Sequence, residues 1–101
     1  MTSSLLPDHI GNISVSTDKD GVEQQWEIID ELKRLQSNTS RIALYLQKLK
    51  PVGNYASIEF RFCYYYATVE GGWGFARNPP MMPASDLSAI VTEAKKKGWI
   101  E

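Results

Sequence analysis

The chain contains few of the residues from which most catalytic and metal sites are built. Among its 101 residues there is one cysteine, Cys63, and one histidine, His9. A single cysteine excludes a framework of intramolecular disulfides and is typical of the reducing cytoplasm, where we expect this protein. One histidine and one cysteine, without carboxylates clustered at ligand spacing, are too few to build a site for a soft metal ion. The sequence therefore predicts no metal and no cofactor.

Long apolar runs and a surplus of positive charge are also missing. No apolar run approaches the roughly 20 residues that span a bilayer. The first residues, MTSSLLPDHIG, have neither the basic nor the apolar section of a signal peptide. The formal net charge is −1, whereas proteins dedicated to nucleic acids or membrane surfaces normally carry a basic excess. We therefore expect a soluble protein that binds neither a membrane nor a nucleic acid.

The sequence shows no arrangement for nucleophilic catalysis. Such a site needs a base within hydrogen-bond reach of the nucleophile, and nothing in the sequence places His9 near Cys63. Arg61, two residues before Cys63 on the same face of a predicted strand, is the one feature that could activate the thiol. Thiols in the middle of a strand are usually packing residues. We therefore expect no catalytic residue and no enzymatic activity.

The length of the chain predicts one domain. A chain of 101 residues fits a single domain of common size. Residues 1–9 are polar, contain a proline and show no periodicity, so we expect a flexible N-terminal segment there. Residues 10–101 would then form the domain.

The first half of this domain predicts a short strand followed by helical structure. Ile13 and Val15 alternate with polar residues, which is the period of a half-buried strand. From residue 22 to residue 49, apolar residues recur at spacings of three or four, with one step of seven and one adjacent pair, as in an amphipathic helix. They are Val22, Trp26, Ile29, Leu32, Leu35, Ile42, Tyr45, Leu46 and Leu49. The run SNTS at 37–40 favours turns, so one long helix and two helices with a tight joint both remain open.

The second half predicts a pair of strands and a final helix. Residues 55–69 alternate between apolar and mixed residues, and a Gly-Gly pair follows that suits a two-residue hairpin turn. The register of such a turn places Trp73 and Phe75 on the same face as the even-numbered aromatic residues of the long strand. A proline-rich connection over 78–83 leads to a helix over 85–97, after which Gly98 allows the next residue, Trp99, to fold back.

The resulting order is strand, helix, strand, strand, helix and a last strand over 99–101 that is short or absent. This is the ferredoxin-like split βαβ plan, βαββαβ. We therefore expect an α+β fold in which an antiparallel sheet carries two helices on one face.

Charge is distributed unevenly along the chain. Residues 1–31 hold seven acidic side chains and one basic one, whereas residues 32–101 hold five acidic and ten basic ones. Acidic residues at the start of the predicted first helix would form a ridge in which like charges repel. The helix dipole or a basic partner would offset that repulsion, and a simply solvated face is the alternative. The candidate partner-binding residues on this ridge are Asp20, Glu23, Glu27, Asp30 and Glu31.

Two further surfaces are candidates for binding. Met81 and Met82, beside three prolines, would offer a stiff and adaptable apolar surface to a partner, or would equally well cover the open end of the core. On the uncovered face of the sheet, Tyr55, Arg61 and Tyr65 would contact a small ligand if the domain were a ligand-binding or regulatory sensor.

The features that carry a family resemblance are the segment Trp26–Leu32, the aromatic strand pair, the proline-containing link, and the motif from Leu87 to Ile90 followed by Gly98. In these features, the chain resembles a family of small bacterial and phage proteins of unknown function. The resemblance covers residues 26–101 and implies no catalytic residues. The absence of catalytic and metal constellations, together with the acidic ridge and the Met-Pro loop, leads us to expect a non-enzymatic domain that binds another protein, as immunity proteins and phage-borne inhibitors do. A homodimer is a further option, because the unpaired edge of a short sheet invites self-association.

Overall fold

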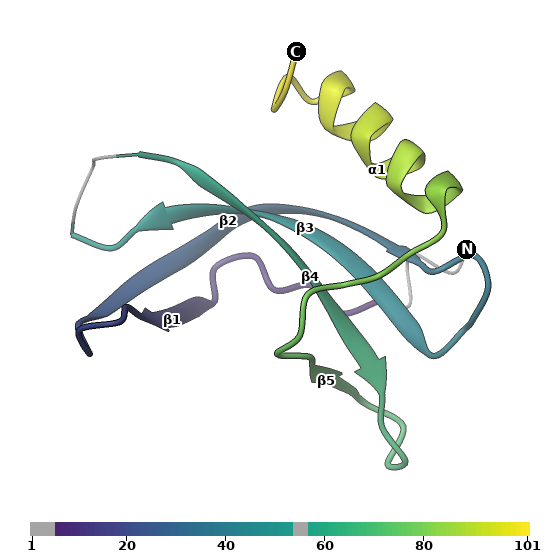
Figure 1. Ribbon diagram of the computed structural model, residues 1–101, viewed down its shortest axis with the longest axis horizontal. Helices are drawn as coiled ribbons and strands as arrows, with labels where there is room; N and C mark the ends of the chain where they lie inside the picture. The colour runs from purple at the N-terminus through teal and green to yellow at the C-terminus, as the bar shows by residue number, and fades with distance from the viewer. Residues whose placement is uncertain (1–5, 54–56) are drawn as a thin grey trace.

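The computed structural model describes residues 6–53 and 57–101. In these residues the chain forms a five-stranded antiparallel sheet, in which each strand lies beside the next strand in the sequence, and one C-terminal helix (Figure 1). The elements are β1 (Ile13–Thr17), β2 (Glu23–Leu35), β3 (Ile42–Pro51), β4 (Glu59–Ala67), β5 (Trp73–Phe75) and α1 (Ala84–Lys96).

The expected ferredoxin-like α+β fold is wrong. That plan needs two helices, and the described residues contain one. The residues expected to form the first helix form strands β2 and β3. The polar run 37–40 belongs to the loop of their hairpin, in which the N–H of Gln36 donates to the carbonyl of Ile42 at 2.9 Å.

The central position of β3 explains the misinterpretation. Both of its faces are covered, so that Leu44 on one face and Tyr45 on the other are fully buried. A strand buried on both faces reads as a continuous apolar run and loses the period of two. In β2, a register shift between Ile28 and Asp30 breaks the alternation in a second way. The remaining apolar spacings then imitate those of a helix.

The sheet has two distinct faces. Helix α1 lies on one of them, which we call the helix face, and the other is the inner face (Figure 1). On the helix face, α1 contributes Ile90 and Ala94 to a core cluster with Leu44 and Leu46 of β3. The sheet curls toward the inner face, since Nη1 of Arg61 in β4 reaches Oγ of a β1 residue, Ser14, at 2.7 Å.

The N-terminal segment lies against the inner face. Leu6 is buried there in a cluster with Tyr45 and Tyr65. The hydroxyl of Tyr45 also donates a hydrogen bond to the carbonyl of Pro7 at 2.7 Å. Residues 6–9 of the segment expected to be flexible are therefore held by the sheet, and residues 1–5 of that segment lie outside the described residues.

The predicted β4–β5 hairpin is present, but its register differs from the expected one. The N–H of Thr68 donates to the carbonyl of Gly72 at 2.9 Å, and Gly71 has a φ of 91°. This is a three-residue loop with a left-handed glycine, and not the expected two-residue turn. Trp73 consequently pairs with Ala67 and Phe75 with Tyr65. Both therefore lie on the inner face, and not beside the even-numbered aromatic residues of β4.

The last turn of α1 follows the sequence prediction. Gly98 has a φ of 75°, and the N–H of Trp99 donates to the carbonyl of Ala94 at 2.9 Å, so the chain folds back as expected. Residues 99–101 form no strand. Within the described ranges 6–53 and 57–101, no helix has the length and apolar character that a membrane crossing requires.

Candidate protein-binding face

The acidic residues assigned to one helical ridge lie on different parts of the sheet. Successive side chains of a strand point to opposite faces, so Asp30 and Glu31 are separated. Asp30 forms an ion pair with Lys97 at 3.1 Å, whereas Glu31 is buried on the inner face. The other three lie at or next to the β1–β2 hairpin: Asp20, Glu23 and Glu27. The expected ridge does not form, because its residues belong to a strand.

Glu31 holds the N-terminal segment on the inner face. Its Oε2 accepts a hydrogen bond from the backbone N–H of His9 at 2.8 Å, and its Oε1 accepts one from Nε2 of Gln47 at 3.0 Å. The ring of His9 stacks on Tyr65 with a centroid distance of 4.3 Å. The carboxylate is thus used within the fold and is not presented to a partner.

Gln47 extends this buried network to β4. Its Oε1 accepts hydrogen bonds from Nε and Nη2 of Arg61, at 3.1 and 2.6 Å, and lies 3.3 Å from Sγ of Cys63. Burial, which outweighs the opposing charge of Arg61, raises the pKa of Cys63 to about 11. The thiol is therefore protonated at neutral pH and is a weak nucleophile.

Of the three residues expected to contact a small ligand, the structure describes two, Arg61 and Tyr65. Arg61 and Tyr65 do lie on one face, but the guanidinium is bonded to Gln47 and Ser14. Tyr65 is buried between other rings, and this burial raises its pKa. Tyr55 lies outside the described residues. The two described residues of this set therefore both make contacts within the fold.

On the helix face, α1 is fixed over β2 by ionic contacts. Nε of Arg34 lies 3.0 Å from a carboxylate oxygen of Asp86 in the first turn of the helix. The pair between Lys97 and Asp30 fixes the other end. Because β2 anchors both ends of the helix, much of β4 on the same face is left uncovered.

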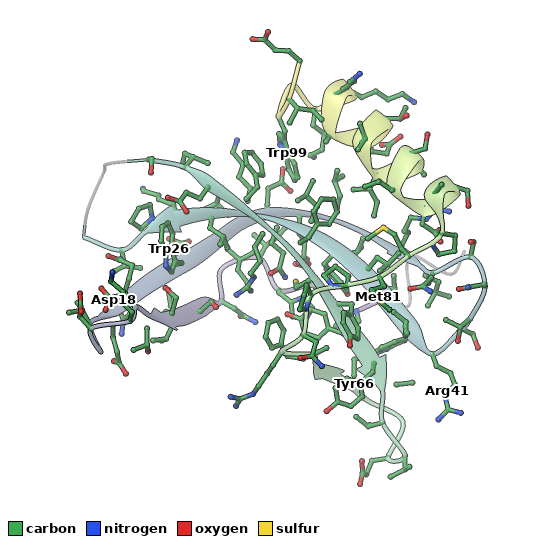
Figure 2. All side chains as sticks on the ribbon, viewed as in Figure 1. Asp18, Trp26, Arg41, Tyr66, Met81 and Trp99 are labelled. Carbon is green, nitrogen blue, oxygen red and sulfur yellow. The ribbon has the colours of Figure 1, made fainter. Side chains whose placement is uncertain are left out.

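A row of aromatic side chains on β4 is consequently open to solvent. Phe60 and Phe62 are each 40% exposed, and Tyr66 is 47% exposed. Trp99 lies beside this row, with its ring centroid 5.2 Å from that of Phe60. Figure 2 shows Trp99, Met81 and Tyr66 spaced along β4, from the C-terminal end of α1 toward the β4–β5 hairpin. We call this surface the aromatic face.

Two grooves hollow the aromatic face. The first, of about 210 Å³, is almost wholly apolar and lies between β4 and the C-terminal end of α1. It is lined by Leu46, Phe60, Phe62, Val91, Ala94, Trp99 and Ile100. Two ammonium groups stand over the ring of Trp99: that of Lys48 at 6.0 Å and that of Lys97 at 5.4 Å. The groove therefore has an apolar floor and a positively charged rim.

The second groove, of about 580 Å³, lies at the connection from β5 to α1. It is lined by Gln36, Ile42, Tyr64, Asn78, Pro79 and Met81. The two methionines differ in their exposure to solvent. Met81 is 87% exposed at the groove, whereas Met82 is partly buried against the core cluster.

Sequence reasoning missed Phe60 and Phe62 as surface residues. Their alternation predicted a buried face, and that prediction assumed two helices to cover the sheet. With one helix, placed over β2, the same face of β4 is open. Comparisons with protein-family models, with curated proteins and with solved structures gave no match.

Proposed function

We propose that this chain is a non-enzymatic protein-binding domain, and that the aromatic face is its binding surface. The observation that carries the proposal is the row of Phe60, Phe62 and Tyr66, each at least 40% exposed and continuous with Met81 and Trp99. Large apolar side chains that are exposed side by side mark interaction sites on protein surfaces. Aromatic residues and methionine are also the types enriched at the centres of protein interfaces.

The charges around the aromatic face indicate the kind of partner. Lys48 has no carboxylate partner among the described residues, and Lys97 is shared between Asp30 and the ring of Trp99. An apolar segment with acidic flanks would complement this rim. We propose that the partner is a toxin, as for an immunity protein, or a host enzyme, as for a phage-borne inhibitor. The cytoplasm is the proposed compartment, in keeping with a single free thiol.

The proposed function is tested by comparing how strongly the wild type and matched variants bind a captured partner protein. The tagged protein is compared with the double variant Phe62→Asp, Met81→Asp, and with Val69→Asp as a control at a fully solvated loop position. We expect the wild type and the control to retain the same protein from host lysate, and the double variant to bind the purified partner at least about tenfold more weakly. Equal affinity of all three proteins for that partner would contradict the proposal.

A second candidate function is small-molecule binding in the groove at the β5–α1 connection. Its volume of about 580 Å³ lies in the range of ligand sites. Oε1 of Gln36, which lines the groove, is buried and has no hydrogen-bond partner among the described residues. A ligand that supplies an N–H or O–H donor would satisfy it. A thermal-shift screen separates the two functions, since such a ligand must raise the melting temperature of the wild type, and of Gln36→Leu much less.

A further inference from the structure

One part of β4 has an open backbone edge. Strand β5 pairs only with residues 65–67 of β4, and the last hydrogen bond on that side runs from the N–H of Ala76 to the carbonyl of Tyr64. On its other side, β4 is paired with β3 as far as Glu59. Among the described residues, no strand therefore covers the outer side of residues 59–63.

The register shows which backbone groups face this open edge. In an antiparallel ladder, the N–H and C=O of one residue point to the same side, and the side alternates along the strand. The carbonyl of Tyr64 points to the β5 side, so the backbone groups of Phe62 and Phe60 point there as well. A strand edge with free N–H and C=O groups is a template for another strand.

We propose that a second copy of this chain pairs with this edge, so that two β4 strands join two sheets into one sheet around a twofold axis. This inference rests on the proposed function, because Phe60 and Phe62 belong both to the aromatic face and to the open edge of β4. A second copy is favoured because the strand is complementary to itself. It carries one negative and one positive side chain two positions apart on the inner face, Glu59 and Arg61, and exposed apolar side chains on the helix face. The Arg61 guanidinium is also bonded to Gln47 and Ser14, and these neutral partners leave its positive charge uncompensated.

Charge and backbone geometry select one register. A twofold axis at Arg61 would place two arginines directly opposite each other, which is unfavourable. An axis at Phe62 would require the backbone of Tyr64, whose carbonyl already accepts from Ala76. An axis at Phe60 places Glu59 opposite Arg61 of the second copy, twice. In this register, Phe60 also meets its own copy.

The same register buries the exposed apolar side chains of the edge. Ile58, which is 45% exposed, comes to lie opposite Phe62 of the second copy, and the two Phe60 rings lie at the centre. Cross-strand pairs of aromatic and β-branched side chains are the stabilising unit of an antiparallel pair. The grooves next to Trp99 in the two copies then belong to one extended surface.

Disulfide trapping tests this register directly. Opposed residues in a hydrogen-bonded antiparallel pair have Cα atoms about 5.5 Å apart, a distance that a disulfide spans. We expect Phe60→Cys to form covalent dimers under mild oxidation, and Phe62→Cys alone to form few. A mixture of Ile58→Cys and Phe62→Cys should form the mixed dimer. The wild type is the control, because its Cys63 is buried. Equal trapping of Phe60→Cys and Phe62→Cys, or trapping of neither, would overturn the proposed pairing.

Sedimentation equilibrium of folded variants supplies an independent measurement. We expect a reversible dimer for the wild type and about tenfold weaker association for Glu59→Lys, since attraction to Arg61 becomes repulsion. Glu70→Lys makes the same charge change in the β4–β5 loop and should leave association unchanged. A wild type that stays monomeric at all concentrations would refute the dimer. If the wild type were monomeric and the double variant Phe62→Asp, Met81→Asp still failed to bind the protein partner, the proposed function would stand and only the dimer would be refuted.

Discussion

Asp86, in the first turn of α1, accepts hydrogen bonds from both the backbone N–H and the hydroxyl of Ser37, at 3.0 and 2.9 Å. The two residues are 49 positions apart. The carboxylate is fully buried and is also next to Arg34. Ser37 lies in the loop between β2 and β3, so this contact ties the N-terminal end of the helix to the sheet. It also determines which part of the helix face α1 covers.

Acid should weaken this tie. Burial by itself would raise the pKa of Asp86, but the hydrogen bonds from Ser37 and the charge of Arg34 outweigh it and lower the pKa. A lowered pKa in the folded state contributes stability that is complete above the unfolded value of about 3.9 and is lost as the pH falls through the folded value. We expect the free energy of unfolding from urea titrations to fall below about pH 4. The Asp86→Asn variant should lose about 1–3 kcal/mol at neutral pH and show a flatter acid dependence. An unchanged acid dependence in Asp86→Asn would show that other carboxylates are responsible.

The buried network around Gln47 should be sensitive to the loss of its amide. Gln47→Met preserves the approximate volume, but it removes the acceptor of Arg61 and one donor to Glu31. A charged or polar group that loses a hydrogen-bond partner away from solvent destabilises a fold by about 1–3 kcal/mol. We expect a loss of this size in chemical denaturation. The exposed Gln25→Met should change stability by less than about 0.5 kcal/mol. Equal effects of the two substitutions would mean that the network contributes little.

Cys63 should be unreactive in the folded protein. Its pKa is raised by burial to about 11, so almost none of it is thiolate at neutral pH. The raised pKa means that its contribution to stability is complete below the unfolded value of about 8.5 and is lost as the pH rises toward 11. We expect thiol reagents to modify Cys63 only at the rate of unfolding, and Cys63→Ala to flatten the alkaline decrease in stability. Rapid labelling of the native protein at neutral pH would contradict this.

Gly74 provides the platform for Tyr66. A Cβ atom at Gly74 would lie 2.7 Å from Cζ of the Tyr66 ring, which packs over the glycine from the opposite strand. Gly74→Ala must therefore displace the ring, and we expect a loss of about 1 kcal/mol in unfolding free energy. In a double-mutant cycle, the same change on a Tyr66→Ala background should cost clearly less. Strict additivity would show that the ring moves freely and that the glycine has no special role.

The sequence predicted the elements whose signals are local. β1, the aromatic strand β4 and α1 with its glycine end all carry patterns that lie within a few residues. The register of the β4–β5 hairpin was not predictable from the Gly-Gly pair, because two-residue and three-residue loops both accept glycine at Gly71. A difference of one loop residue was enough to move Phe75 to the other face.

The region from β2 to β3 could not be predicted for a different reason. The burial of both faces of β3 is a property of its place in the sheet, not of its own residues. The candidate site shares this dependence. Phe60 and Phe62 are apolar whether a second helix covers them or not, and only the number and position of helices decides their exposure.

The strand order also has a consequence for synthesis of the chain. Each strand pairs with its neighbour in the sequence, so each hairpin of the sheet can form as soon as its second strand leaves the ribosome. The helix follows all five strands in the sequence, and Asp86 in its first turn makes the contact back to Ser37. Until the helix docks, Leu44 and Leu46 lack the cover that Ile90 and Ala94 provide. Docking of the helix is therefore the step that buries this apolar face of the sheet, and exposed apolar surface of this kind promotes aggregation during folding.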